Sequence, residues 1–204
     1  MLDRLDDYCL RIELRRRDAL KLAAAGAAGG AAGLVASCGG GSGGREVTTT
    51  LSPEQAQADA AELNALLDLE RTAVLAYSIG QRFLSGSSLQ LARRFAAHER
   101  AHEQALEQAL RRLRIGPAPA RPERSYTAGF PPLRSAQDVL RFALDVENTQ
   151  VSAYSDSLGV VVTPALRTTL LSILGAEAEH MSVLLGALHQ PQAAQAFVTG
   201  NAPT

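Results

Sequence analysis

The sequence predicts an all-α protein whose folded part is a four-helix bundle built from two helical hairpins. Two observations support this prediction: four apolar stretches recur at helical spacing, and a short motif occurs twice. Tryptophan is absent and aromatic residues make up 4% of the 204 residues, so leucine and alanine have to fill the core. The formal net charge of −1 provides no basic field for nucleic acid, and we expect no nucleic-acid partner.

Residues 1–37 have the pattern of a bacterial export signal. The string RRRDALK, with Arg16 and Arg17, resembles the twin-arginine signal, and an Ala/Gly-rich apolar stretch follows it. Ala19 stands where that signal usually carries a large apolar residue. The resemblance implies the twin-arginine translocation machinery as a partner. The alternative is an uncleaved membrane anchor, although the stretch is short and weakly apolar for a span.

Val35, Ala36, Ser37 and Cys38 resemble a bacterial lipobox. The resemblance implies that Cys38 carries a lipid anchor, so we expect a protein at the outer face of a bacterial membrane. The alternative is a spare or buried cysteine, which the glycines around Cys38 disfavour. Residues 38–51 are then a flexible tether. Cys9 lies in the removed peptide, so neither a disulfide nor thiol catalysis is expected.

Four helices account for residues 52–190. Ser52, followed by a proline and Gln55, predicts a capping box at the first helix, and Gly86 with two serines ends that helix. Ser135 is the expected cap of the third helix, and Thr163 before a proline is that of the fourth. We expect helices over about residues 52–85, 89–115, 135–159 and 163–190, with a C-terminal tail over 191–204.

The segment Gly116–Arg134, between the second and third helices, is rich in proline and glycine and far longer than a usual bundle loop. Extended, it reaches roughly 60 Å, the length of a bundle. We therefore expect a crossover that makes the second and third helices parallel, whereas the helices within each hairpin are antiparallel.

An internal repeat indicates that the two hairpins are duplicated copies. LDLERTAVLAYS, residues 67–78, aligns without gaps with LDVENTQVSAYS, residues 144–155. Glu70 and Glu147 occupy the same place in the two copies, among apolar neighbours where a lone charge is costly. Both lie near the middle of their helices, so head-to-tail packing of the hairpins would bring them together.

Each copy also has a Glu-x-x-His pair further along the chain. Glu99 and His102 form one pair, and Glu177 and His180 form the other. Residues three apart share a helix face, so each pair is within reach of one ion. The repeat glutamate precedes its paired glutamate by 29 residues in the first copy and by 30 in the second, so the register is kept. We expect all these side chains to converge near mid-bundle.

This order of Glu, Glu-x-x-His, crossover, Glu and Glu-x-x-His resembles the ferritin-like superfamily, which includes rubrerythrins and manganese catalases. The resemblance covers about residues 52–190. It implies a carboxylate-bridged dimetal centre with two iron ions, or manganese. The implied metal ligands are Glu70, Glu99, His102, Glu147, Glu177 and His180. No CxxC rubredoxin module is present, so a rubrerythrin-type reductive cycle would need an outside electron donor.

Charge arithmetic also favours metal, because four buried carboxylates with no cation would repel one another and two divalent ions would cancel their charge. The alternative is a protonated or solvated polar core without metal. Tyr77 and Tyr154 follow the repeat glutamates by two turns on the same face. We expect them to be core residues rather than a redox relay, with hydroxyls able to support the ligands by hydrogen bonds.

His98 to His102 also spell H-E-x-x-H, the pattern of zinc peptidases. The position that matches His98 in the second copy is Ala176, so this histidine is outside the repeated design, and we expect it on the flank of its helix. His189 is expected near the C-terminus of the last helix, where a charged imidazole would be stabilising.

The expected function is redox chemistry at the cell envelope, either ferroxidase activity or the scavenging of peroxide or oxygen. A zinc peptidase is a less favoured alternative. Another is a non-enzymatic envelope protein that binds metal structurally or binds a partner during stress. A homodimer is compatible with the sequence.

Overall fold

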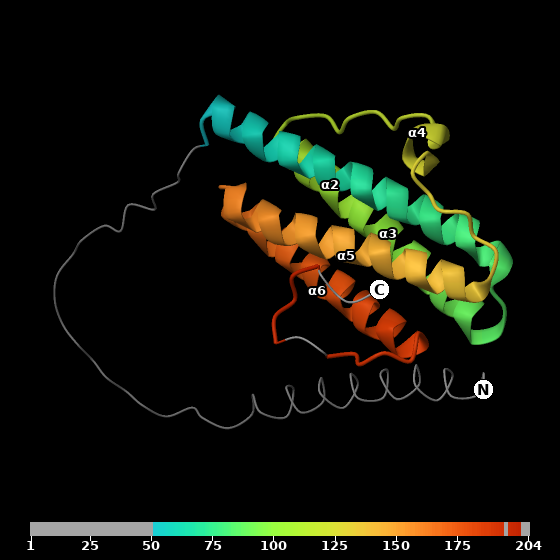
Figure 1. Cartoon of the computed structure of the whole chain (residues 1–204). Coiled ribbons are helices and arrows are strands. Elements are labelled where there is room, and N and C mark those ends of the chain that lie inside the picture. The colour runs from blue at the N-terminus through green and yellow to red at the C-terminus, as the bar shows by residue number, and fades with distance from the viewer. Residues whose placement is uncertain (1–50, 194–195, 201–204) are drawn as a thin grey trace, which may run out of the picture. The chain divides into compact units, whose positions relative to one another are not determined.

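The computed structural model describes residues 51–193 and 196–200. The expected export signal with Arg16 and Arg17, the expected lipidation site Cys38 and nearly all of the tether lie outside the described residues and stay predictions. Every regular element of the described part is a helix (Figure 1). The elements are α2 (Pro53–Gly80), η1 (Gln81–Phe83), α3 (Gly86–Arg112), α4 (Glu123–Thr127), α5 (Ala136–Val160) and α6 (Pro164–Ala187).

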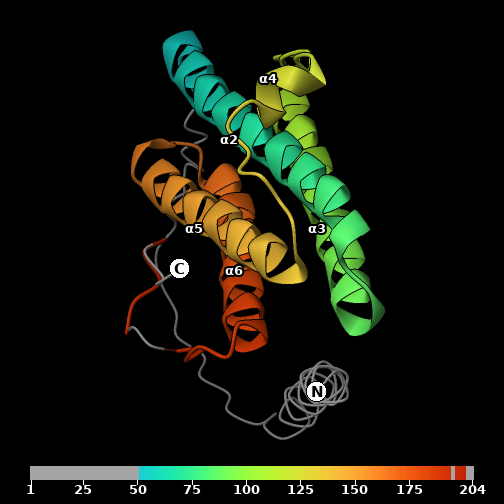
Figure 2. The same cartoon turned by 45° about the vertical axis from the view of Figure 1, so that its right-hand side comes forward.

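The four long helices form the predicted bundle of two hairpins. Helix α2 packs against α3, and α5 packs against α6, while α2 also contacts α5 across the bundle. Figure 2 shows the α2–α3 pair and the α5–α6 pair as two distinct layers. In Figure 1, α3 and α5 run in the same direction, as the crossover requires. The all-α fold class and the bundle are therefore confirmed.

Helix α2 begins where the sequence predicted. The Ser52 side chain accepts a hydrogen bond from the Gln55 backbone N–H, and the Gln55 side chain accepts one from the Ser52 N–H, so the capping box is complete. Pro53 is the first helical residue, where its missing N–H costs nothing.

Helix α3 starts three residues earlier than the expected Leu89. Gly86 alone makes the turn, with a left-handed φ of 54°, and the two serines after it fit the first helical turn, whose N–H groups need no intrahelical partner. At the other end, Arg114 adopts φ 61° and the Ile115 N–H bonds to the Leu110 carbonyl. This Schellman-type end closes the helix at Arg112, ahead of the expected Ile115.

The cap of α6 comes from another helix. Thr163 is the N-cap residue, as predicted, but its side chain makes no capping bond. Instead, the buried Asp59 on α2 accepts hydrogen bonds from the Val162 N–H, the Thr163 N–H and the Thr163 hydroxyl. The carboxylate satisfies N–H groups at a helix N-terminus and ties the second hairpin to the first.

The crossover is more ordered than the extended linker that the sequence suggested. It contains the short helix α4 and follows α2 (Figure 1). The Ala118 N–H donates to Asn64 Oδ1 at 2.7 Å, and the Tyr126 hydroxyl donates to Asp68 Oδ1 at 3.1 Å. Asp68 is therefore partly covered by the crossover, whereas Asp145, its counterpart in the second copy, is exposed.

Leucine fills the core on both sides of the bundle centre, as the composition predicted. Leu63, Leu67, Leu106, Leu144 and Leu170 are fully buried. Helix α6 is long and apolar enough to cross a membrane by length and composition alone. It packs against α5 in the bundle and presents buried polar groups there, so we interpret it as a core helix.

Candidate metal centre

All six predicted ligand side chains meet at the middle of the bundle. Helix α2 contributes Glu70, α5 contributes Glu147, and α3 and α6 each contribute a Glu-x-x-His pair. The four glutamates have no exposed surface, and His180 is 2% exposed. The convergence predicted from the repeat is therefore present in the fold.

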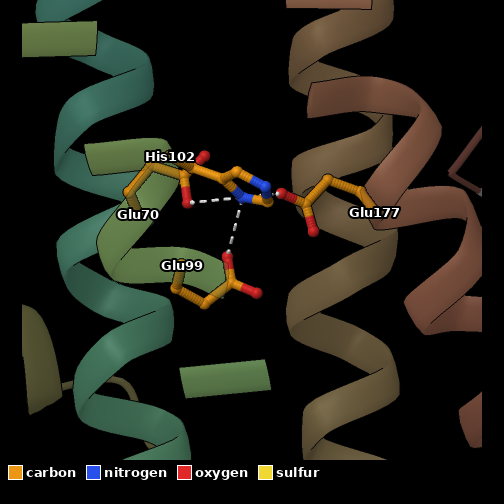
Figure 3. Close-up of side chains that lie close together, drawn as sticks. All are labelled: Glu70, Glu99, His102 and Glu177. Carbon is orange, nitrogen blue, oxygen red and sulfur yellow. Dashed lines mark ion pairs between the residues drawn. The ribbon is translucent and has the colours of Figure 1, made fainter. Parts of the chain in front are cut away.

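We call the first half of this cluster the His102 subsite, which consists of Glu70, Glu99, His102 and Glu177. One ligand atom from each residue lies within 4.8 Å of the others. Nδ1 of His102 is 2.8 Å from Oε1 of Glu177, and it lies 3.6 Å and 3.7 Å from Oε2 of Glu99 and of Glu70. Figure 3 shows these four side chains pointing toward one another from both hairpins.

The His180 subsite consists of Glu99, Glu147, Glu177 and His180. Nδ1 of His180 lies 3.2 Å from Oε1 of Glu99, 3.4 Å from Oε2 of Glu147 and 3.1 Å from Oε2 of Glu177. The ring of His180 stacks on Phe95 with 3.9 Å between centroids, which holds the imidazole in place.

Glu99 and Glu177 belong to both subsites. Each turns one carboxylate oxygen toward His102 and the other toward His180. Glu70 and Glu147 each belong to one subsite. The arrangement thus contains two shared carboxylates between two sets that each hold one further carboxylate and one imidazole, which suits a pair of adjacent cations.

Six ligand atoms at this centre lie close together without forming hydrogen bonds. Both oxygens of Glu177, Oε1 of Glu99, Oε2 of Glu147 and Nδ1 of both histidines are buried without a hydrogen-bond partner. His102 Nδ1 and Glu177 Oε1 approach to 2.8 Å and still lack hydrogen-bond geometry. Buried polar atoms are normally paired, so their convergence without pairing indicates a place for a cation.

Two tyrosines support the terminal carboxylates from the opposite hairpin. The Tyr77 hydroxyl donates to Oε1 of Glu147, and the Tyr154 hydroxyl donates to Oε1 of Glu70. Both tyrosines are buried, as expected of core residues. The internal repeat relates these two hydrogen bonds, because each copy supplies the tyrosine that donates to the glutamate of the other copy.

Two further residues at the site escaped the sequence prediction. Nε2 of the buried Gln150 donates to Oε2 of Glu70 and to Oε2 of Glu99, at 3.1 Å each. Nδ1 of His98 lies 2.9 Å from Nε2 of His180. His98, expected on the flank of its helix, is instead half-buried against the centre. The repeat did not mark Gln150, because Ala73 occupies the matching position in the first copy.

The pKa values of the four clustered glutamates are shifted in two directions. Burial raises the pKa of Glu70 and of Glu147 well above the usual value, and neighbouring carboxylates add to the shift. Burial acts in the same direction on Glu99 and Glu177, but His102 and His180 outweigh it and lower the pKa of both carboxyls.

The histidines show the opposite balance. Burial alone would lower the pKa of His102, but the carboxylates of Glu177, Glu70 and Glu99 raise it to about 12. The pKa of His180 is likewise raised by its carboxylate neighbours against the effect of burial. Without metal, these shifts favour the charged form of both imidazoles and of Glu99 and Glu177, and the neutral form of Glu70 and Glu147. For His98, burial and the two other imidazoles lower the pKa, so it is neutral and can accept a hydrogen bond at Nδ1.

These residues fit two divalent cations. The donor set is rich in carboxylates and free of thiols, which suits iron or manganese, and the orphaned atoms are the ones that ligands would use. The zinc-peptidase arrangement is not formed. Within residues 51–193 and 196–200, no cluster of side chains that could hold a metal ion includes His98, and Glu99 faces the centre.

Comparison with known proteins shows the same fold. A conserved hypothetical protein, rv2844, from Mycobacterium tuberculosis has a solved structure that is 20% identical and covers 70% of this chain and 99% of its own, with a TM-score of 0.59. A dodecameric thioferritin, related to bacterioferritin, from Bacteroides fragilis is 20% identical over 66% of this chain and 86% of its own, with a TM-score of 0.56.

Another solved structure, described as ferritin-like diiron-carboxylate proteins from Bacillus anthracis str. Ames, is 20% identical and covers 68% of this chain and 99% of its own, with a TM-score of 0.54. No curated protein sequence matches the chain. The Ferritin-like domain family matches residues 50–190, which is the bundle together with the site. The chain therefore belongs to the ferritin-like domain family.

Proposed function

We propose that the bundle binds two iron or manganese ions at the six converging residues and acts as a redox protein that consumes peroxide or oxygen or oxidises ferrous iron. The observation that carries this proposal is the set of buried carboxylate and imidazole atoms without hydrogen-bond partners. Buried polar atoms without hydrogen-bond partners destabilise the fold, and a bound cation would remove that destabilisation. A pair of such ions would supply two electrons to oxygen or to hydrogen peroxide.

The residues of the chain prepare the site for that chemistry. Glu99 and Glu177 span the two subsites and hold them together. The Tyr77 and Tyr154 hydroxyls fix the orientation of Glu147 and Glu70. The leucine layers around the centre exclude bulk water, so the charges interact strongly and side reactions with solvent are reduced.

The export and anchoring of this protein are part of the proposal. The RRRDALK string and Cys38 support twin-arginine export followed by lipid attachment at the outer face of a bacterial membrane. Twin-arginine export carries folded proteins, so the ions could be installed before export. Labelling of the native protein with a radioactive fatty acid, compared with Cys38→Ala, tests the anchor, and a signal that persists in the variant would refute it.

The test of the metal proposal is elemental analysis of the full chain, together with activity. We expect about two ions per chain in the wild type and far fewer in His102→Ala/His180→Ala, with His189→Ala as a matched histidine control outside the site. The wild type should consume peroxide or oxygen, or oxidise ferrous iron, and the double variant should not. A wild type that binds no iron or manganese would refute the proposal, whereas metal without turnover would favour the non-enzymatic alternative.

A further inference from the structure

The two subsites are not equivalent, although the helices that build them are repeated. The repeat gives both subsites a terminal glutamate, a tyrosine and a histidine. Two residues near the centre break the repeat: Gln150 stands where the first copy has Ala73, and His98 stands where the second copy has Ala176. Gln150 contacts carboxylate oxygens that face His102, whereas His98 contacts His180, which makes their effects separable.

Gln150 occupies oxygen atoms that face the His102 subsite. Its amide donates to Oε2 of Glu70 and Oε2 of Glu99, the oxygens of these two carboxylates that lie within ion-pair distance of His102 Nδ1. Because Tyr154 donates to the other oxygen of Glu70, both oxygens of that carboxylate already accept hydrogen bonds. An ion in the His102 subsite would compete with the Gln150 amide for these oxygens, which weakens the binding of that ion.

The His180 subsite has its ligand atoms free. Oε1 of Glu99, Oε2 of Glu147, Oε2 of Glu177 and Nδ1 of His180 all lack a hydrogen-bond partner. Glu147 is the counterpart of Glu70, but only its Oε1 accepts a hydrogen bond, from Tyr77. Four donor atoms are therefore available here, against two at the His102 subsite, Oε1 of Glu177 and Nδ1 of His102.

His98 adds order to the same subsite. With an ion bound beside the carboxylates at Nδ1 of His180, the Nε2 of this ring would carry the hydrogen and donate to Nδ1 of His98, which lies 2.9 Å away. That bond fixes the tautomer that leaves Nδ1 free for an ion, and stacking on Phe95 fixes the plane of the ring. The His180 side chain is 3% exposed, whereas that of His102 is 12% exposed and so closer to water.

We propose that the two subsites load in a fixed order: the His180 subsite binds the first and tighter ion, and the His102 subsite binds the second, exchangeable ion. His98 and Gln150 are the positioning residues that set this difference. This inference rests on the proposed function, since it requires that the centre binds two ions at all.

The experiment is an anaerobic titration of the metal-free full chain with Mn²⁺, followed by the electron paramagnetic resonance signal of free Mn²⁺. We expect two binding steps whose dissociation constants differ tenfold or more. Glu70→Ala should keep the tight step, and Glu147→Ala should keep only the weak one. Loss of the tight step in Glu70→Ala would overturn the assignment of the order.

Variants of the two positioning residues test the cause. His98→Leu should weaken the first step about tenfold or more, whereas His98→Asn, whose Oδ1 can stand near the place of Nδ1, should stay within about threefold of the wild type. Gln150→Leu, of similar volume, should tighten the second step severalfold. His189→Ala, at an exposed position beyond α6, should change neither step.

The outcomes separate the two proposals. Two ions of equal affinity would overturn the loading order, and equal effects of His98→Leu and His98→Asn would overturn the role assigned to His98. Either result would leave dimetal binding intact. A wild type that binds no Mn²⁺ and no Fe²⁺ in the same titration would overturn the loading order and the proposed function together.

Discussion

Glu70 and Arg71 are neighbours on α2 and both are buried, yet their polar atoms are in opposite situations. Arg71 is satisfied by protein groups. Its Nε donates to Glu103 Oε1 at 3.3 Å, its Nη1 donates to the Ala118 carbonyl at 3.1 Å, and Asp68 and Glu107 lie within ion-pair distance. We call this group the Arg71 cluster. It joins α2, α3 and the crossover without any ligand.

The metal centre beside it has more charge and fewer bonds. Six of its carboxylate and imidazole atoms have no hydrogen-bond partner, although several lie within 3.5 Å of one another. In a buried polar cluster with a structural role, the polar atoms have hydrogen-bond partners within the protein. In a ligand-binding cluster, some of them have no partner until the ligand binds. The difference implies that the Arg71 cluster stabilises the bundle in every state, and that the centre depends on what it binds.

The largest effect is expected from Glu177→Gln. Glu177 is one of the two ionised carboxylates that balance the imidazolium groups, and it has no exposed surface. Its loss leaves a buried positive charge without a counter-charge, which costs about 3–5 kcal/mol. Chemical denaturation of the metal-free variant should show that loss, and metal binding should disappear. Unchanged stability would mean that the metal-free centre is not charged as described.

A strong dependence of metal affinity on pH should follow. The pKa of His102 is about 12, and the pKa values of His180, Glu70 and Glu147 are also raised, so these groups favour their protonated forms in the metal-free centre. Ions bind the deprotonated groups, so binding should release protons and the affinity should rise with pH.

Calorimetry in buffers of different ionisation enthalpy measures this proton release near pH 7. The expected sign is release on binding, and affinity should fall as the pH falls. An affinity independent of pH between 6 and 8 would contradict the charge balance that the geometry indicates. His189→Ala serves again as the control, because its imidazole lies beyond α6.

Arg71→Met should have a smaller effect of a different kind. Asp68, Glu103 and Glu107 are each 27–36% exposed, so water can solvate them when Arg71 is removed. The cost should be about 2 kcal/mol, below that of a fully buried pair, and equal with and without metal. Denaturation in both states checks this. A loss confined to the metal-bound state would place Arg71 in the metal centre rather than in the fold.

The six convergent residues could be predicted from the sequence because their placement follows from short-range helical spacing and from the repeat. Helical spacing places Glu99 beside His102, and the duplication places Glu147 where Glu70 stands in the first copy. The capping box at Ser52 is equally local. Features of this kind are readable because each is set by residues a few positions apart or by a repeated register.

The residues that the sequence did not reveal depend on contacts between distant segments. Gln150 reaches Glu70 across 80 positions, and His98 reaches His180 across 82. Each occurs in one copy of the repeat only, so the duplication gives no register for it. The order of the crossover has the same origin, because Ala118 and Tyr126 bond to residues of α2 that lie 54 and 58 positions away.

The smallest effect on folding, and the sharpest test of the comparison, is expected from Glu70→Gln. Burial raises the pKa of Glu70 and so favours its neutral form in the metal-free centre, and a neutral amide of the same shape should replace it with little change in charge. The Tyr154 hydroxyl keeps an acceptor, and the Gln150 amide can turn its unpartnered Oε1 toward the new amide N–H, so stability without metal should change by about 1 kcal/mol or less.

Metal binding should respond differently to the same substitution. An amide is a poorer ligand than a carboxylate, so the His102 subsite should lose its ion while the His180 subsite keeps one. Denaturation and elemental analysis of the same preparation give both readouts. If Glu70→Gln destabilised the metal-free protein as much as Glu177→Gln, Glu70 would be part of the structural charge balance, and the contrast between a satisfied Arg71 and an open centre would no longer hold.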